Sequence, residues 1–330
     1  MLQTPRAFAR LFALAALAAA PAAAEPVKVA MNGVEDLATN SEYAFVVAFR
    51  DSLAAAGIEV ETFPSGSLGS EDERLAQTSQ GLIHVNLAAV TAPASMSPAV
   101  RGFIMPFMFE SAEAFDRVIA ESDLLAHVNA PLLDQGLRLA AFNLRGLDAG
   151  IFNAKRPVAT VADLEALRMR ALNKGQVAFF EALGVRSTVV SWAEVSNALQ
   201  TGVVDGYVNP PNAALRTGHT EFLKHYTPAA LAPSFRAVIV SQDWWDLQPP
   251  ETQAALEAAI AAGVAANRAW VADWAGEVDA RFAEAGVTVT ELAPGERAEM
   301  QARAARVWES VMSAEDLAAF RAAIDGAAGG

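Results

Sequence analysis

Short apolar runs alternate along this chain with helical patterns that stop at a glycine, and this alternation constrains the fold more than any other feature. Strands are predicted over residues 27–32, 58–63, 83–90, 137–143, 167–171 and 187–190. Between them, apolar residues at helical spacing end at Gly57, Gly81, Gly184 and Gly202. Such alternation is typical of parallel or mixed sheets with helices on both faces, and it predicts an α/β protein.

The length of 330 residues predicts two domains, since a domain holds roughly 150 residues. No Gly/Ser-rich linker separates them, so the chain is expected to cross between two lobes through strands or a shared helix. Apolar residues spaced by three or four predict a long helix from Pro250 to Gly286 that braces both lobes. Two capping boxes, Ser70 with Glu73 and Ser191 with Glu194, are predicted to open helices.

The predicted lobes are discontinuous in sequence. Lobe I is expected to hold residues 25–147 plus about 236–265, and lobe II residues 148–235 plus about 266–330.

Charge and cysteine content exclude several classes of function. The formal net charge of −14 argues against a nucleic-acid surface and against binding to an anionic membrane, since both need clustered Lys and Arg. The chain has no cysteine, which excludes thiolate chemistry, disulfides and Cys-ligated metals.

The first residues indicate the compartment. Arg6 and Arg10 precede an unbroken apolar run over 11–20, and Ala22-Ala23-Ala24 supplies a small-residue cleavage pattern. These features predict a signal peptide over residues 1–24 and a location in a bacterial periplasm. A membrane anchor is the alternative, but the apolar run is shorter than the roughly 20 residues that span a bilayer.

The search for catalytic chemistry finds little. The four histidines are scattered and match no usual metal spacing, and the chain has no G-x-S-x-G elbow, Walker loop or G-x-G-x-x-G motif. We therefore expect no catalytic residue, no cofactor and no metal site.

The informative side chains lie in the middle of the chain. Arg168 and Arg170 share one side of a short strand, and a guanidinium fork matches a carboxylate with two hydrogen bonds. Trp192 follows the next strand, and Asn209 follows another. Ligands of α/β sheets bind at the carboxyl ends of strands, so these residues predict a carboxylate site. Three plainer readings stay open at this point, namely a surface ion pair for either arginine, simple packing for Trp192, and a turn at Asn209-Pro210.

Four segments together resemble the DctP-type solute-binding proteins of tripartite ATP-independent periplasmic (TRAP) transporters. They are Phe63-Pro-Ser-Gly-Ser-Leu-Gly-Ser-Glu71, Met105-Pro-Phe-Met-Phe109, Asp163-Leu-Glu-Ala-Leu-Arg-Met-Arg170 and Ala198-Leu-Gln-Thr-Gly-Val-Val-Asp-Gly-Tyr-Val-Asn-Pro210. The resemblance covers essentially the whole chain after residue 24. It implies a two-lobed periplasmic binding protein that closes on a small organic acid and delivers it to membrane permease subunits.

The resemblance also implies roles for single residues. Arg170 would clamp the ligand carboxylate, Asn209 would assist it, and Asn32 and Trp192 would contact the ligand. Arg168 stands where relatives often have Lys, so it is expected on the surface or in packing.

Two departures from the family pattern affect the expected ligand. Gly150 stands where many relatives carry a second arginine, and Val208-Asn-Pro210 replaces the usual Glu-Asn-Pro. One cation and extra room at the glycine predict a monocarboxylate, with Trp192 and Tyr207 offering aromatic contacts.

Other outcomes stay open. Arg145, Lys155 or Arg236 could restore the second cation and make the protein a dicarboxylate binder. A secreted carboxylate-processing enzyme and a ligand-presenting partner of a membrane sensor kinase are the alternative functions.

Overall fold

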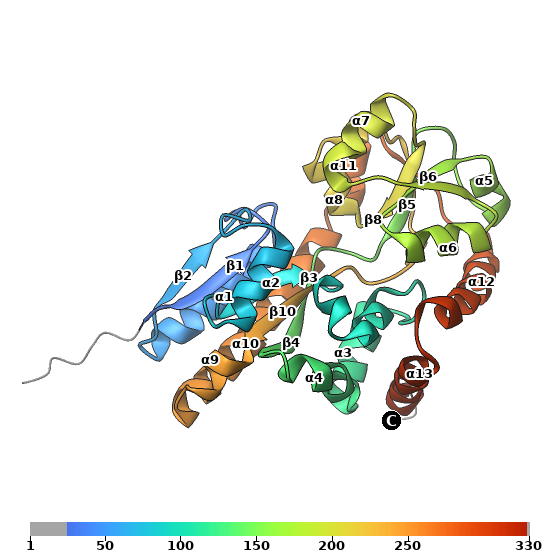
Figure 1. Cartoon of the computed structure of the whole chain (residues 1–330). Helices are drawn as coiled ribbons and strands as arrows, with labels where there is room; N and C mark the ends of the chain where they lie inside the picture. Colours follow the sequence, from blue (N-terminus) through green and yellow to red (C-terminus); the bar gives the residue numbers. More distant parts are fainter. Residues whose placement is uncertain (1–24, 329–330) are drawn as a thin grey trace, which may run out of the picture.

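The structure is a computed structural model that describes residues 25–328 (Figure 1). The predicted signal peptide lies outside the described residues. No helix within the described range is both long and apolar enough to span a membrane.

The chain forms two mixed sheets. The first has the order β2-β1-β3-β10-β4, and the second has the order β11-β9-β5-β8-β6-β7. The strands of the first sheet are β1 (Val27–Met31), β2 (Val60–Phe63), β3 (Val85–Ala89), β4 (Leu137–Leu144) and β10 (Phe235–Ser241). Those of the second sheet are β5 (Gly150–Asn153), β6 (Arg168–Ala171), β7 (Arg186–Val189), β8 (Gly206–Asn209), β9 (His225–Thr227) and β11 (Thr288–Val289). Two helix-flanked mixed sheets confirm the predicted α/β, two-lobed fold.

Strand direction is mixed within each sheet. Strand β1 pairs in parallel with β2 and β3, whereas β10 runs antiparallel to β3 and β4. In the second sheet β6 pairs in parallel with β7 and β8, whereas β5 runs antiparallel to β8 and β9. The strand β10 returns to the first sheet late in the sequence, so the lobes interleave along the chain.

Helices cover both sheets (Figure 1). The α-helices are α1 (Ser41–Ala55), α2 (Glu71–Ser79), α3 (Ala112–Glu121), α4 (Leu124–Leu133), α5 (Val161–Glu165), α6 (Lys174–Ala182), α7 (Val195–Gln200), α8 (Pro211–Arg216), α9 (Gln242–Asp246), α10 (Pro250–Ala275), α11 (Val278–Glu284), α12 (Glu296–Val311) and α13 (Ala314–Ala328). The 3₁₀ helices within residues 25–328 are η1 (Ala92–Ser95), η2 (Pro98–Ile104), η3 (Trp192–Glu194) and η4 (His219–Glu221).

The long helix is present, but its predicted end is wrong. Helix α10 stops at Ala275, and α11 resumes at Val278 rather than continuing unbroken to Gly286. The Gly276 N–H donates to the Asp273 carbonyl at 3.2 Å, a tightening of the last turn that ends the helix. Helix α10 lies along the first sheet against α1, and α11 places Phe282 in the core of the second lobe.

One predicted capping box is confirmed and the other is wrong. The Ser70 hydroxyl accepts from the Glu73 N–H at 3.3 Å while the Glu73 carboxylate accepts from the Ser70 N–H at 2.7 Å. At the second position, the Ser191 hydroxyl donates to the Glu194 carboxylate at 2.6 Å and caps no backbone N–H. The segment after Ser191 therefore forms the 3₁₀ helix η3 first, and the α-helix α7 begins only after it.

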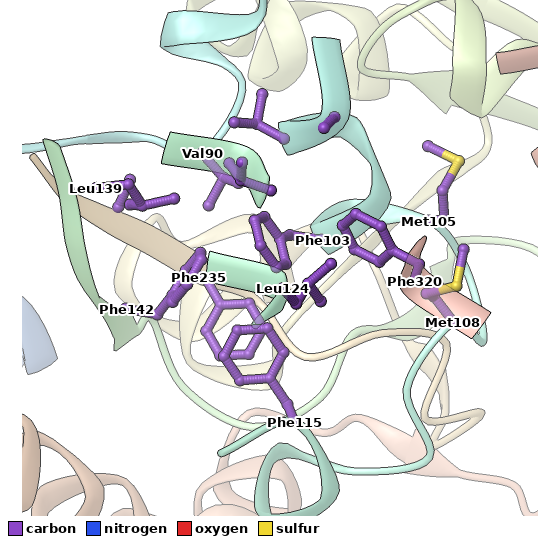
Figure 2. Close-up of a cluster of buried hydrophobic side chains, with 14 of the residues drawn as sticks. Val90, Phe103, Met105, Met108, Phe115, Leu124, Leu139, Phe142, Phe235 and Phe320 are labelled. Atoms are coloured by element: carbon purple, nitrogen blue, oxygen red, sulfur yellow. The ribbon is translucent and has the colours of Figure 1, made fainter. Parts of the chain in front are cut away.

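The core of the first lobe is rich in phenylalanine (Figure 2). The rings of Phe103 and Phe142 meet edge to face at 4.7 Å, and those of Phe115 and Phe142 at 4.8 Å. Phe320 of α13 packs over Gly102, where an added Cβ would lie 2.4 Å from its ring. Helix α13 thus contacts α3 and α4 of the first lobe. The lobe boundaries predicted from the sequence stay a prediction.

Two segments, 145–149 and 228–234, connect the sheets and lie side by side. The Arg145 N–H donates to the Ser234 carbonyl at 2.8 Å. Ala149 and Leu231 add bonds at 2.9 Å, from the Ala149 N–H to the Ala232 carbonyl and from the Leu231 N–H to the Ala149 carbonyl. This narrow ladder is one of the connections between the two sheets, and short connecting segments of this kind occur at hinges.

Candidate functional site

Strand register brings four of the predicted site residues to one face of the second sheet. Gly150 lies directly opposite Asn209 in the β5–β8 pair, and Arg170 lies opposite Tyr207 in the β6–β8 pair. Because residues two apart on a strand share a face, Tyr207 and Asn209 point the same way. The predicted residues Arg170, Tyr207, Asn209 and Gly150 are therefore neighbours on three adjacent strands.

Arg170 is buried without a counterion. It is 3% exposed, and its Nε donates to the Val190 carbonyl at 2.9 Å. Its Nη2 has no hydrogen-bond partner, and Arg170 forms no ion pair with a carboxylate within residues 25–328. Burial lowers the pKa of Arg170, and the nearby Tyr207 opposes that effect. A buried and unpaired cation costs several kcal/mol, so an anion that binds this guanidinium would offset that cost.

Arg168 has the opposite environment. It is exposed, and its guanidinium grips Asp205 with bonds of 2.8 and 3.1 Å. The prediction that Arg168 lies at the surface is confirmed.

Asn209 is buried, and its Nδ2 also lacks a partner in the described part of the chain. It ends β8 one residue before Pro210, and α8 follows directly. Arg170 and Asn209 thus place two buried donors without acceptors on neighbouring strands. Such donors are costly unless something accepts a hydrogen bond from them.

Trp192 stands beside Arg170. The Cζ atom of Arg170 lies 5.7 Å from the centre of the Trp192 ring, which is 38% exposed. Tyr207, by contrast, is fully buried beneath Trp192, with ring centres 5.9 Å apart. The Tyr207 hydroxyl meets His219 Nδ1 at 3.2 Å, and His219 Nε2 meets the Ser196 hydroxyl at 2.8 Å. His219 is buried, and its ring contacts the rings of both Tyr207 and Trp192.

The expectation of extra room at Gly150 is wrong. An added Cβ on Gly150 would lie 2.4 Å from Cε2 of Tyr226 and 2.7 Å from the Thr227 carbonyl oxygen. The Tyr226 ring already fills the space that the missing side chain leaves.

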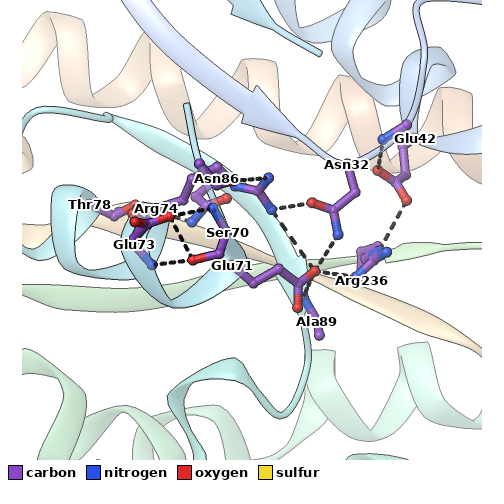
Figure 3. Close-up of polar contacts among 12 residues, drawn as sticks. Asn32, Glu42, Ser70, Glu71, Glu73, Arg74, Thr78, Asn86, Ala89 and Arg236 are labelled. Carbon is purple, nitrogen blue, oxygen red and sulfur yellow. Dashed lines mark hydrogen bonds and ion pairs between the residues drawn. The ribbon is translucent and has the colours of Figure 1, made fainter. Parts of the chain in front are cut away.

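Asn32 directly follows β1 in the first lobe. Figure 3 shows the polar contacts that surround it. Its amide donates to Glu71 and accepts from Arg74, so both of its polar atoms are engaged. Arg236 on β10 completes the network, because its Nη1 donates to Glu71 at 2.7 Å and its Nε donates to Glu42 at 3.1 Å. Burial lowers the pKa of Arg74.

Sequence reasoning missed Glu42, Glu71 and Arg74. Glu71 begins α2 and Arg74 lies one turn later, directly after the loop that follows β2. A position just beyond the carboxyl end of a strand was the available signal, since ligands of α/β sheets bind there.

The three candidates for a second cation have different environments. Arg236 pairs with Glu42 and Glu71. Lys155 is exposed and lies 3.8 Å from Asp205, at the opposite end of β5 from Gly150. Arg145 lies half-buried in the connecting segment and forms no ion pair with the described residues; burial, with some help from Arg236, lowers its pKa to about 10.

The described residues contain no group of three or more His, Asp or Glu side chains placed to hold a metal ion.

Two helix-flanked mixed sheets joined by short connecting segments, together with the long helix α10, give this chain the two-lobed architecture of a periplasmic binding protein. The DctP family model, described as bacterial extracellular solute-binding protein, family 7, matches residues 40–315. This chain belongs to that family, which confirms its resemblance to the solute-binding proteins of TRAP transporters.

Individual relatives agree with this assignment. The C4-dicarboxylate-binding periplasmic protein DctP of Rhodobacter capsulatus is 29% identical over 257 residues, covering 76% of this chain and 75% of that protein. A TRAP periplasmic solute-binding protein from Ochrobactrum anthropi has the same fold with a TM-score of 0.84 at 23% identity, covering 92% of this chain and 96% of that one. The corresponding protein from Roseobacter denitrificans, solved with bound β-D-glucuronate, has a TM-score of 0.79 at 23% identity, covering 92% and 99%.

Proposed function

We propose that this protein is a periplasmic binding protein that captures a small monocarboxylate between its lobes and delivers it to TRAP permease subunits. One observation carries the proposal: Arg170 Nη2 and Asn209 Nδ2 are buried donors on adjacent strands, and neither has a partner among residues 25–328. A carboxylate has two acceptor oxygens and one negative charge, which matches a guanidinium nitrogen, an amide nitrogen and an unpaired positive charge.

The preference for a single carboxylate rests on the charge of the surrounding residues. The second-sheet face offers one buried cation, and Gly150 and Tyr226 add no charge beside Asn209. In the first lobe, Arg236 is held by Glu42 and Glu71. A second ligand carboxylate would lose its hydration without gaining a partner, at a cost of several kcal/mol.

The remainder of the ligand is expected to be hydroxylated. Trp192 adds an exposed ring that suits the flat face of a sugar or an aromatic acid. The relative solved with β-D-glucuronate, a hydroxylated monocarboxylate, supports this class.

A C4-dicarboxylate is the second candidate, and Arg145 favours it. This arginine forms no ion pair with the described residues and lies in the connecting segment, where Asn212 of α8 donates to its carbonyl at 2.5 Å. The relative from Rhodobacter capsulatus bears the name of a C4-dicarboxylate-binding protein.

A thermal-shift screen followed by competition calorimetry decides between the two. The panel contains D-glucuronate, lactate, pyruvate and phenylacetate as monocarboxylates, with succinate and malate as dicarboxylates. A ligand at 100 times its dissociation constant stabilises the protein by about 2.7 kcal/mol, which a melting curve detects. Submicromolar binding of succinate or malate alone would favour the second candidate, and binding of no acid would overturn the carboxylate assignment.

The periplasmic location and the absence of turnover belong to the same proposal. Cell fractionation with and without residues 1–24 tests export, with retention in the cytoplasm expected for the shortened chain. Recovery of each bound acid unchanged after prolonged incubation is expected, and any conversion would favour the enzyme alternative. Co-purification with a permease rather than a sensor kinase would identify the membrane partner.

A further inference from the structure

The Tyr226 side chain fills the space that a side chain at position 150 would need. An added Cβ on Gly150 would lie 2.6 Å from the Tyr226 hydroxyl oxygen, well inside contact distance. The ring is held in place by Phe152 at 4.5 Å and Phe282 at 5.0 Å between ring centres. The tyrosine ring and a side chain at position 150 therefore exclude each other, and this chain has the tyrosine.

The Tyr226 hydroxyl reaches the face that carries Asn209 and Arg170. It overlies Gly150, which is the direct partner of Asn209 in the β5–β8 pair. Two strand spacings of about 4.8 Å, with the two-residue offset between Tyr207 and Asn209, put the Cα of Arg170 roughly 12 Å from that of Gly150. The length of an arginine side chain together with a small acid is enough to span that distance.

The phenol is available and neutral. Its hydroxyl has no hydrogen-bond partner within residues 25–328, although Tyr226 as a whole is 6% exposed. Burial raises the pKa of Tyr226, and the carboxylates of Asp148 and Glu291 raise it further. At neutral pH the site therefore contains a protonated hydroxyl that can both donate and accept a hydrogen bond.

We propose that Tyr226 is a specificity-determining residue whose hydroxyl binds a hydroxyl or keto oxygen of a monocarboxylate held by Arg170. This assignment rests on the proposed function. It selects hydroxylated or keto monocarboxylates over their deoxy counterparts, because the deoxy ligand would bury the phenol without a partner.

Calorimetry with matched ligand pairs tests the assignment. Lactate with propionate and mandelate with phenylacetate each differ by one hydroxyl. The Tyr226→Phe variant keeps the ring over Gly150 and removes only the hydroxyl. We expect it to weaken binding of the hydroxylated acid about fivefold to tenfold while the deoxy acid changes less than about twofold, the size of one hydrogen bond. Tyr43→Phe, which removes a hydroxyl from α1 in the first lobe, is the matched control and is expected to alter neither.

The outcomes separate the two levels of the proposal. Equal weakening of both members of a pair, or no change in either, overturns the role of Tyr226 while Arg170-dependent binding still stands. Failure of the wild-type protein to bind any monocarboxylate overturns the proposed function and the assignment of Tyr226 with it. A native melting curve for Tyr226→Phe shows that any loss comes from the site rather than from the fold.

Discussion

The guanidinium of Arg170 and the ring of Trp192 lie 5.7 Å apart, with the charge buried and the ring open to solvent. A guanidinium within about 6 Å of an aromatic ring is attracted to the ring's negative face. The pair therefore combines a binding charge with a surface that can shield it from water once a ligand arrives.

Replacing Arg170 is expected to abolish tight binding. Arg170→Ala leaves a desolvated ligand carboxylate unpaired, which costs about 2 to 5 kcal/mol, or roughly 30-fold to several thousand-fold in affinity. Arg170→Lys is also expected to weaken binding, because a point charge cannot reproduce the planar fork or the bond to Val190. Calorimetry measures both. Arg168→Ala is the control, and a larger loss there than at Arg170 would contradict the assignment.

Trp192 is expected to matter for affinity and little for stability. Trp192→Ala removes exposed ring area, so the melting temperature should stay within a few degrees while affinity falls about fivefold to fiftyfold. Leu247→Ala serves as the control, because Leu247 is 82% exposed and lies on the first lobe just after α9. A loss of stability with unchanged binding would assign Trp192 to packing.

Asn209 is expected to separate stability from binding. Asn209→Asp supplies Arg170 with a carboxylate from the protein itself, so the free protein should keep or gain stability while ligand affinity falls at least about 100-fold. Asn209→Ala removes one donor and should cost about 1 to 3 kcal/mol of binding. Melting curves and calorimetry on both variants give the comparison. Binding that is weaker in Asn209→Ala than in Asn209→Asp would contradict this prediction.

Ligand binding is expected to make the molecule more compact. The connecting segments 145–149 and 228–234 share few backbone bonds, whereas each lobe has its own packed core. Lobes of this kind rotate as rigid bodies, so small-angle scattering should show a smaller radius with ligand and circular dichroism no change. Arg170→Ala at the same ligand concentration should keep the larger radius. An unchanged radius for the saturated wild type would rule out closure.

Asp148 in the connecting segment is expected to make stability depend on pH. Burial, followed by the charge of Glu113, raises the pKa of Asp148 to about 6, and Arg297 partly opposes this. The folded state then holds a proton that the unfolded chain releases near pH 4, so the contribution to stability is present below about pH 4 and is lost as the pH rises to about 6. Asp148→Asn should match the wild type at pH 4 and exceed it by about 1 to 3 kcal/mol at pH 8 in denaturant unfolding. An equal difference at both pH values would assign the effect to packing instead.

Local patterns in the sequence determine much of this protein. The alternation of strand and helix signals places β1, α1 and the capped helix α2 within a few residues of their observed bounds. The same is true of the strand that carries Arg170. These features depend on spacings of two to four residues, which the sequence states directly. The spacing of apolar residues did not predict the break between α10 and α11. The last turn of α10 tightens through a bond between near neighbours, and apolar spacing does not encode such a bond.

Only the tertiary structure decides how those pieces meet. Glu42 and Arg236 form their bond across 194 residues of sequence, and α13 returns to the core of the first lobe. The pairing of β9 with β5 brings Tyr226 to lie over Gly150. The Tyr226 ring therefore fills the space beside Gly150 that the sequence suggests is empty. Strand order and register bring distant residues together, and both are selected by the packing of the whole chain rather than by any short segment of it.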